Sequence, residues 1–347
     1  MSMAGLIRMF AKAARPGRKR LRVPSAPALP ALLGLPAGAA ALKRLAAGVT
    51  ARKTGKARPP RPAPGSFITD TFVCPQGEID FRFYTPKGSA GRRMPLVVML
   101  HGCTQTAADF AAGTAMNRLA DAMGVLVLYP QQSPKANIGR CWNWHDPRNQ
   151  VRGKGEPALI AALARHAIVL GRANPSRVYI AGISAGGTAA AIIGAAYPDL
   201  FAAVGVHSGV PLGNIRSLRS AVAAMRGKPR AGIGGKLPPQ LPTIVFHGDQ
   251  DRIVHPSNAG GFLGNLERSR PGPLVCRMAT GRTDRGRDFT RRTYQNQSGR
   301  TLLEEWTVHG CGHGWSGGRA SGSHTDPAGP DASREMLRFF LARRRGG

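Results

Sequence analysis

Acidic residues are scarce in this chain. Of its 347 residues, 18 are Asp or Glu and 49 are Lys or Arg, which gives a formal net charge of +31. Residues 1–65 contain 14 Lys or Arg and no acidic residue. A charge of this size predicts non-specific attraction to polyanions and anionic membranes. Because no base-reading motif or aromatic stacking platform accompanies the charge, we expect no specific nucleic-acid partner.

Long uninterrupted apolar runs are also missing. The apolar stretch at residues 26–42 is interrupted by prolines and is too short to cross a bilayer. It follows the basic segment 18–22, and this order is similar to that of a secretory signal. Three interpretations of residues 1–65 stay open: an export signal, a membrane-surface segment, or a mostly disordered tail. We expect a secreted or periplasmic protein, with a cytoplasmic location as the alternative.

Cysteine spacing excludes one class of site. The five cysteines stand at positions 74, 103, 141, 276 and 311, and no two of them form a C-x-x-C pair. Structural zinc sites commonly use that spacing, so we expect no metal centre.

From residue 66 onward the composition becomes that of a globular domain, which we expect to span residues 66–347. Strands at 71–73 and 79–84 should open a sheet, and strands and helices then alternate. Such alternation predicts an α/β fold with a mostly parallel sheet and helices on both faces. The expected order is strand 95–100, helix 107–123, strand 125–129, loop 130–154, helix 156–172, strand 177–182, helix 185–197, strand 203–206, an irregular segment 210–240, strand 243–247, helix 257–269, basic loop 281–292, strand 301–308 and helix 331–343.

A G-x-S-x-G motif lies between an expected strand and an expected helix. It reads Gly182-Ile183-Ser184-Ala185-Gly186. In this setting the serine occupies a sharp, strained turn, and the glycines allow neighbouring backbone to approach closely. We therefore predict that Ser184 is a nucleophile.

A nucleophilic serine needs a histidine to take its proton and a carboxylate to orient that histidine. Asp251 is the preferred carboxylate, because it lies in the loop past the carboxyl end of strand 243–247, where open α/β sheets build their sites. Asp249, two residues earlier, is the rival and is expected to shape the turn.

His313 is the preferred base. It lies in a glycine-rich loop after strand 301–308, and such a loop can bring an imidazole against the serine. We expect His309 to be structural, at the end of that strand. His255 and His324 are expected to be exposed loop residues.

Two backbone N–H groups should stabilise the oxyanion of a tetrahedral intermediate. One belongs to Ala185, the residue after the nucleophile. The other belongs to Cys103, in the loop that follows strand 95–100. Cys103 and Cys141 lie in two loops that should border this site, so a disulfide between them is expected in an exported protein. Cys276–Cys311 is a second candidate, with Cys74 left free; in the cytoplasm all five thiols should be reduced.

Three tryptophans lie near the expected site in sequence. Trp142 and Trp144 are in the long loop 130–154, and Trp315 follows His313 by two residues. We interpret them as an aromatic wall for the acyl or polymer part of a substrate, with a folded Ω-loop as the alternative for the first two.

Several short segments occur here in a specific combination. Together they resemble the polyhydroxybutyrate depolymerase-type esterases, α/β-hydrolases related to feruloyl and acetylxylan esterases, over about residues 68–344. The segments are H-G-C-T-Q-T-A from His101, C-W-N-W from Cys141, G-I-S-A-G-G from Gly182, residues 197–209, H-G-D-Q-D from His247, G-H-G-W-S-G-G from Gly312, and Thr325-Asp326-Pro327.

The resemblance implies ester hydrolysis by a Ser–His–Asp triad without a cofactor. It places the nucleophile, acid, base and one oxyanion donor at Ser184, Asp251, His313 and Cys103. The expected substrates are esters of the 3-hydroxybutyrate oligomer type, small or polymeric. Feruloyl or acetyl esters of polysaccharide are the alternative within this fold. A granule- or polyanion-binding protein that uses the basic segment 1–65 is the alternative from another class.

Overall fold

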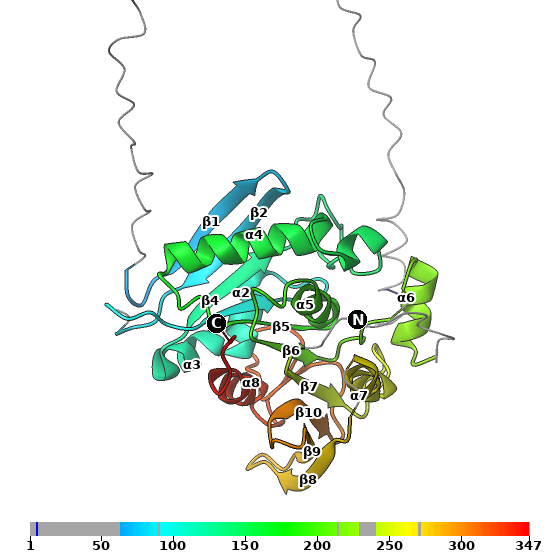
Figure 1. The fold of residues 1–347 in the computed structure, drawn as a ribbon. Coiled ribbons are helices and arrows are strands. Elements are labelled where there is room, and N and C mark those ends of the chain that lie inside the picture. Colours follow the sequence, from blue (N-terminus) through cyan, green and yellow to red (C-terminus); the bar gives the residue numbers. More distant parts are fainter. Residues whose placement is uncertain are drawn as a thin grey trace, which may run out of the picture.

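The computed structural model describes residue 5 and residues 63–88, 91–213, 215–228, 241–269 and 272–346. Within these ranges the chain forms a ten-stranded sheet with helices packed on both faces (Figure 1). The predicted basic extension, apart from residue 5 and its last three residues, 63–65, lies outside the described residues, as does part of the irregular segment 210–240.

The central strands of the sheet are parallel and buried. Their apolar residues alternate between two core clusters, so that Val98 faces one cluster and Val97 and Met99 face the other. Burial on both faces explains the near-continuous apolar runs of these strands. In sheet order they are β4 (Leu126–Gln131), β3 (Leu96–Leu100), β5 (Val178–Ile183), β6 (Ala203–His207), β7 (Thr243–Gly248) and β10 (Thr301–Val308).

Both edges of the sheet are antiparallel. β1 (Phe67–Cys74) and β2 (Gly77–Tyr84) form a hairpin that joins the sheet beside β4, which confirms the predicted opening strands. At the other edge, β10 pairs with β9 (Asp288–Gln295), and β9 pairs with β8 (Val275–Arg282).

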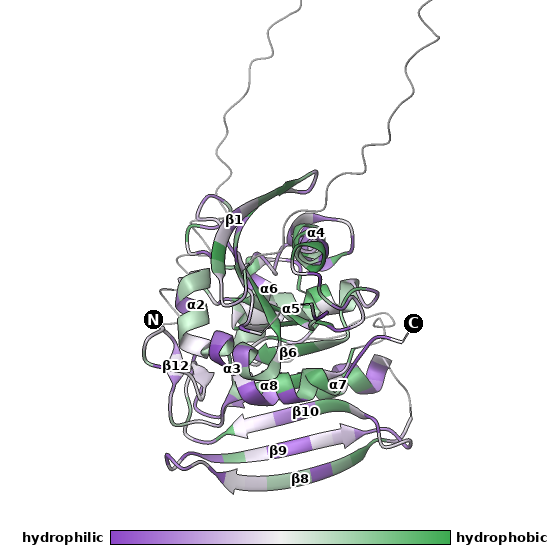
Figure 2. Cartoon of the chain, turned by 90° about the vertical axis from the view of Figure 1, so that its left-hand side faces the viewer, coloured by the Kyte–Doolittle hydropathy of each residue, from purple (hydrophilic) through white to green (hydrophobic). Residues whose placement is uncertain are grey.

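The prediction of a basic loop at 281–292 was wrong. Residues 275–295 form the β8–β9 hairpin, whose turn is closed by the Thr283 N–H donating to the Arg287 carbonyl at 2.9 Å. The arginines suggested a loop, but edge strands tolerate charged residues because one face meets solvent. β8 is exposed along nearly its whole length at the margin of the molecule (Figure 2).

Two groups of helices cover the two faces. Helices α4 (Gly155–Leu170), α5 (Ala185–Ala196), α6 (Leu218–Met225) and α7 (Ser257–Ser269) contribute to one core cluster. Helices α2 (Ala107–Thr114), α3 (Met116–Met123) and α8 (Ala332–Leu341) contribute to the other. The single helix predicted at 107–123 is divided in two because Ala115 adopts a left-handed conformation, with φ of 50°.

The remaining elements are short. They are the 3₁₀ helix η1 (Pro147–Gln150) and the paired strands β11 (Trp315–Ser316) and β12 (Thr325–Asp326). No helix within the described ranges is both long and apolar enough to span a membrane. The mostly parallel sheet with helices on both faces confirms the predicted α/β-hydrolase fold. The carboxyl ends of its parallel strands meet at one edge, where such folds place their sites.

Candidate active site

Ser184 lies on a strained turn between β5 and α5. Its φ of 57° and ψ of −122° are outside the regions that L-residues normally occupy. The Ser184 N–H donates to the His207 carbonyl at 2.9 Å, which holds the turn against β6. A Cβ on Gly186 would overlap the carbonyl oxygen of Leu100, and a Cβ on Gly182 would collide with the Gly186 backbone. The two motif glycines therefore have the steric role that the sequence predicted.

Asp251 and His313 meet across two loops. Asp251 follows β7, and His313 follows β10, the parallel neighbour of β7. Nδ1 of His313 lies 2.7 Å from Oδ2 of Asp251. Because a carboxylate only accepts hydrogen bonds, this contact holds the proton on Nδ1 and leaves Nε2 unprotonated in the neutral ring.

Asp251 is fully enclosed. Its Oδ1 accepts hydrogen bonds from the N–H groups of Ile253 and Val254, both at 2.9 Å. His247, which sequence reasoning missed, places Nε2 3.5 Å from Oδ2 of Asp251 and also donates to the Val254 carbonyl at 2.8 Å. Burial opposes ionisation of Asp251, but the contacts with His247 and His313 outweigh it and lower the pKa of Asp251 well below its usual range.

The rival residues pair with each other. Nδ1 of His309 lies 2.9 Å from Oδ2 of Asp249, and Nε2 of His309 contacts the Thr290 hydroxyl at 2.9 Å. Oδ1 of Asp249 accepts from the Gly310 N–H at 2.7 Å. These bonds connect the ends of β7, β9 and β10. His255 is exposed and contacts the Ser257 hydroxyl at 2.9 Å.

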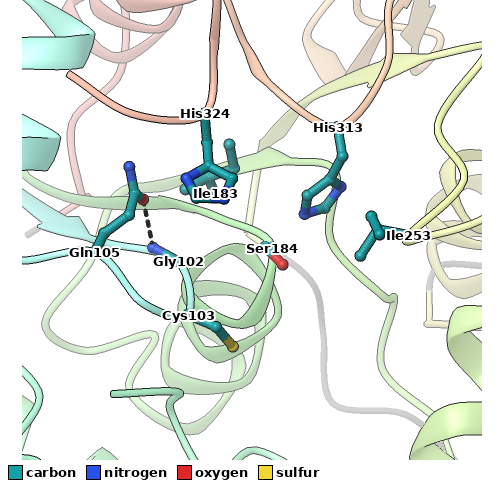
Figure 3. Close-up of a pocket in the computed structure, with 8 residues that line it drawn as sticks. All are labelled: Gly102, Cys103, Gln105, Ile183, Ser184, Ile253, His313 and His324. Carbon is teal, nitrogen blue, oxygen red and sulfur yellow. Dashed lines mark hydrogen bonds between the residues drawn. The ribbon is translucent and has the colours of Figure 1, made fainter. Parts of the chain in front are cut away.

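A cavity of about 80 Å³ opens beside Ser184. Figure 3 shows Ser184 between Cys103 on one side and His313 on the other. His324, expected to be an exposed loop residue, lines this cavity, so that expectation was wrong. Hydrogen bonds to Asp109 and Gln105 hold the loop that carries His324, and these residues are so distant in the sequence that no local pattern indicates the contact. The lining residues are Gly102, Cys103, Gln105, Ile183, Ser184, Ile253, His313 and His324.

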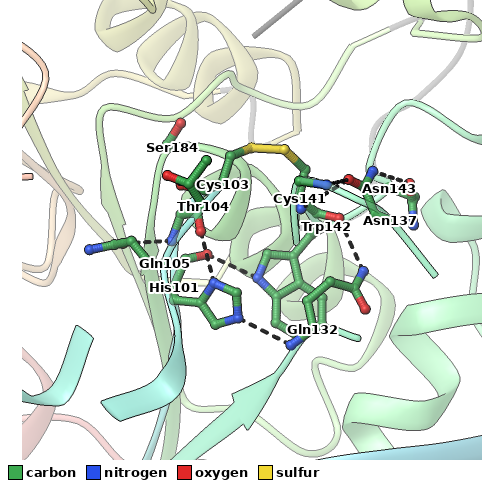
Figure 4. Close-up of a disulfide and its surroundings, with 12 residues drawn as sticks. His101, Cys103, Thr104, Gln105, Gln132, Asn137, Cys141, Trp142, Asn143 and Ser184 are labelled. Atoms are coloured by element: carbon green, nitrogen blue, oxygen red, sulfur yellow. Dashed lines mark hydrogen bonds between the residues drawn. A yellow bond between two sulfur atoms is a disulfide. The ribbon is translucent and has the colours of Figure 1, made fainter. Parts of the chain in front are cut away.

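The loop after β3 carries Cys103. The Cys103 N–H makes no hydrogen bond to any residue that the structure describes, and Ala185 is the first residue of α5, where an N–H has no intrahelical acceptor. His101 anchors the loop from below: its Nδ1 donates to the Gly102 carbonyl at 2.8 Å and its Nε2 accepts from the Gln132 N–H at 3.1 Å (Figure 4). Burial lowers the pKa of His101 to about 4, so this imidazole is neutral at pH 7.

Cys103 and Cys141 form a disulfide, as predicted for the first candidate pair (Figure 4). The second predicted pair is wrong, because Cys276 and Cys311 are both free. Cys276 is exposed near the start of the edge strand β8, whereas Cys311 is buried past the end of β10, with β9 between the two strands. Cys74 is free, as expected.

Removal of the disulfide should destabilise the fold. The bond closes a loop with a sequence separation of 38 residues, and a cross-link of this length restricts the unfolded chain. We expect Cys141→Ser to lower the free energy of unfolding by about 2–4 kcal/mol in urea titrations. The matched control is Cys276→Ser at an exposed free thiol, which should change stability by less than about 0.5 kcal/mol. Equal effects of the two substitutions would show that the bond has no stabilising role.

The predicted aromatic wall is largely wrong. Trp142 and Trp315 are each 1% exposed and do not line the cavity. Trp142 Nε1 donates to the His101 carbonyl at 3.0 Å, and Trp315 Nε1 donates to the Ser333 hydroxyl at 3.0 Å. Both rings have core neighbours and satisfied N–H groups, which explains why they fold inward.

Trp144 differs from the other two tryptophans. It is also buried, but it lines a second, smaller cavity that reaches Ser184 and Cys103. The other lining residues are Ala185, Thr188, Val210, Met225 and Val254. Trp144 is therefore the one tryptophan of the three that the structure brings to the serine.

Trp142→Ala should lower stability. Truncation removes a fully buried ring and its hydrogen bond to the loop that carries Cys103. We expect the free energy of unfolding to fall by about 3–5 kcal/mol, as measured by urea titration. Ile138→Ala is the control, because Ile138 lies in the same long loop but is 62% exposed. A Trp142→Ala protein as stable as the control would contradict a core role for the ring.

Glu156, in the first turn of α4, forms hydrogen bonds to the loop 130–154 that contains Trp142 and Trp144. Its carboxylate accepts from the Asn143 N–H at 2.8 Å and from the Gln132 side chain at 2.6 Å. Burial raises the pKa of Glu156 to about 7, against these hydrogen bonds. Sequence reasoning missed this residue. The described ranges contain no group of three His, Cys, Asp or Glu residues arranged to hold a metal ion.

Comparison with known proteins gives concordant matches. Residues 79–272 match the family model described as esterase PHB depolymerase. Poly(3-hydroxyalkanoate) depolymerase C of Paucimonas lemoignei is 31% identical over 252 residues, covering 69% of this chain and 59% of that protein. Feruloyl esterase B of Neurospora crassa is 36% identical over 116 residues, covering 33% of this chain and 39% of that protein. The chain thus spans less than two thirds of each of these relatives.

A solved structure supports the fold. Acetyl xylan esterase from Aspergillus awamori superposes with a TM-score of 0.60 at 21% identity, covering 80% of this chain and 99% of that one. More than half of the chain lies within the matched family model. The turn at Ser184, the segment between Cys103 and Cys141, and the loop after β7 all fall inside it. The chain therefore belongs to the esterase PHB depolymerase family.

Proposed function

We propose that the protein is a serine esterase that hydrolyses carboxylic esters through an acyl-enzyme on Ser184. One observation carries the proposal: Ser184 and His313 line the same cavity, and Nδ1 of His313 lies 2.7 Å from Oδ2 of Asp251. Ser184, His313 and Asp251 thus come from three loops at one edge of the sheet. They can serve as the nucleophile, the base and the carboxylate that orients the base.

In the first half of the reaction, Oγ of Ser184 attacks the ester carbonyl carbon while Nε2 of His313 takes the hydroxyl proton. The new negative charge forms on the former carbonyl oxygen, where the N–H groups of Cys103 and Ala185 stabilise it. Collapse of this intermediate breaks the ester C–O bond. His313 returns the proton to the departing alkoxide, and the acyl group stays on Ser184.

In the second half, water takes the place of the alcohol. His313 removes a proton from the water as it attacks the acyl-enzyme, and then gives that proton to Oγ of Ser184 as the acid leaves. Asp251 stays ionised throughout and stabilises each imidazolium that forms on His313. The lowered pKa of Asp251 favours this role, because a protonated carboxyl could not do so.

The preferred substrate class is esters of 3-hydroxybutyrate oligomer type. The match to the Paucimonas lemoignei depolymerase supports it, since that match covers the larger part of the chain. The small cavity lined by Trp144, Val210 and Met225 suits a short apolar group next to Ser184. Feruloyl or acetyl esters of polysaccharide are the second candidate class, favoured by the match to feruloyl esterase B.

Two measurements on the full chain test the proposal. A panel of soluble 3-hydroxybutyrate oligomers, feruloyl esters and acetyl esters should show turnover without added metal or cofactor. A fluorophosphonate probe should block that turnover and add its mass to the peptide that contains Ser184. Absence of turnover across the panel, or inactivation by a label on another residue, would overturn the proposal. The relative kcat/KM values within the panel decide between the two substrate classes.

A further inference from the structure

His324 is a second imidazole in the cavity beside Ser184. It enters from the loop between β11 and β12, faces the same space as His313, and has no role in the proposed reaction steps (Figure 3). Its backbone is left-handed, with φ of 53°. This conformation is uncommon for a residue other than glycine and persists where surrounding contacts fix the loop.

A hydrogen-bonded clamp holds this loop against the loop that carries Cys103. Asp109 on α2 accepts from the Ser323 N–H at 2.9 Å and from the Ser323 hydroxyl at 2.6 Å. The Gln105 amide donates to Asp109 at 3.0 Å and to the Ser323 carbonyl at 3.1 Å, while its oxygen accepts from the Gly102 N–H at 2.9 Å. These hydrogen bonds therefore fix the position of His324 relative to the loop that carries Cys103.

The clamp also determines the tautomer of His324. The Ser323 hydroxyl has one proton, and the Asp109 carboxylate takes it, since a carboxylate cannot donate. Nδ1 of His324 lies 2.9 Å from the same hydroxyl oxygen and must therefore be the donor. Its Nε2 then has a free lone pair in the neutral ring, and this nitrogen contacts no hydrogen-bond partner among the described residues.

The neutral form is favoured in this position. Burial is the main cause that lowers the pKa of His324, and the nearby His313 lowers it further, while Asp109 opposes both. At neutral pH the cavity thus contains a fixed hydrogen-bond acceptor, with the apolar side chains of Ile183 and Ile253 lining the same space.

We propose that Nε2 of His324 accepts a hydrogen bond from a hydroxyl group of the substrate, which makes His324 a specificity-determining residue for hydroxylated esters. The proposal rests on the esterase function proposed above. An ester carbonyl has no proton to donate, and a carboxylate would require a protonated ring. Within the ester classes proposed above, a hydroxyl is the substrate group that can donate a proton to a neutral acceptor. A hydroxyl close to the scissile ester can reach His324 from the acyl side or from the alcohol side.

Matched ester pairs that differ by one hydroxyl test this inference. On the acyl side the pair is 4-nitrophenyl 3-hydroxybutyrate and 4-nitrophenyl butyrate; on the alcohol side it is 2-hydroxypropyl acetate and propyl acetate. The preference is the ratio of kcat/KM values within a pair. His324→Phe keeps a ring of similar size without nitrogens, and should lower the preference in at least one pair by about 5- to 30-fold. The unhydroxylated ester of that pair should change by less than about threefold.

A second variant protects the test against misfolding. His324→Asn suits the left-handed backbone, but its side chain is too short to reach the same position, so it should lose the preference as well. His255→Phe is the matched control, because this imidazole is exposed and lies outside the cavity. The pair that responds identifies the acyl or the alcohol side as the source of the hydroxyl.

Two different failures are distinguishable. If the wild-type protein hydrolyses the esters but both variants keep the wild-type preference in both pairs, or lose activity on all four esters in parallel, the role of His324 is overturned and the esterase function stands. If the wild-type protein hydrolyses none of the esters, the proposed function itself fails and this inference fails with it.

Discussion

Ser184→Ala should reduce kcat for any ester substrate by about 10⁴- to 10⁶-fold. The substitution removes the atom that forms the acyl-enzyme, and neither His313 nor Asp251 can then act, because both serve the serine. The residual rate should come from substrate binding and from the N–H groups of Cys103 and Ala185. Steady-state hydrolysis of a chromogenic ester by the purified full chain gives the measurement.

The fold should survive this change. Alanine at the left-handed position of Ser184 is no more strained than serine, so the melting temperature should stay within a few degrees of wild type. Ser208→Ala is the control, since Ser208 follows the neighbouring strand β6 and is also buried with a positive φ. We expect its kcat to stay within about tenfold of wild type. A Ser184→Ala protein with activity in that same range would end the assignment of the nucleophile.

Asp251→Asn should reduce kcat by about 10²- to 10⁴-fold. The amide oxygen can keep the bonds from the Ile253 and Val254 N–H groups, which turns the amide nitrogen toward His313. That nitrogen is a donor, so His313 must present a lone pair at Nδ1 and hold its proton on Nε2, where it cannot accept the proton of Ser184. The loss should appear in kcat with little change in the melting temperature.

Asp249→Asn is the matched control for this experiment. Asp249 is a carboxylate two residues away in the same loop, and it also contacts a histidine, His309. Neither member of that pair lines the cavity beside Ser184. We expect its kcat to stay within about tenfold of wild type. The opposite ranking of the two substitutions would move the orienting role to Asp249.

Local patterns predicted the parts of the fold that obey local rules. The apolar runs of the central strands, the antiparallel opening strands and the elbow at Ser184 each depend on residues close together in the sequence. The basic β8–β9 hairpin was missed because its arginines suit an exposed edge strand as well as a loop. The break at Ala115 was missed because alanine is a good helix former, and only packing places it in a left-handed conformation.

Side-chain direction was the hardest feature to predict in the site. The pairing of Asp251 with His313 was predicted, because both residues follow strands that should end at one edge of the sheet. Trp142 and Trp315 lie in equally suggestive positions, yet both rings turn into the core, where backbone or hydroxyl acceptors satisfy their N–H groups. His324 turns the other way, into the cavity, because Asp109 and Gln105 hold its loop.

The amino-acid sequence by itself determined the order of the elements, the strained turn at Ser184 and the choice of residue types for nucleophile, base and acid. These follow from steric limits and hydrophobic periodicity over a few residues. Only the tertiary structure decided that His309 meets Asp249, which tryptophan reaches the serine, and that His324 faces the cavity. Such contacts join segments far apart in the chain, so they depend on how whole strands and loops pack against one another.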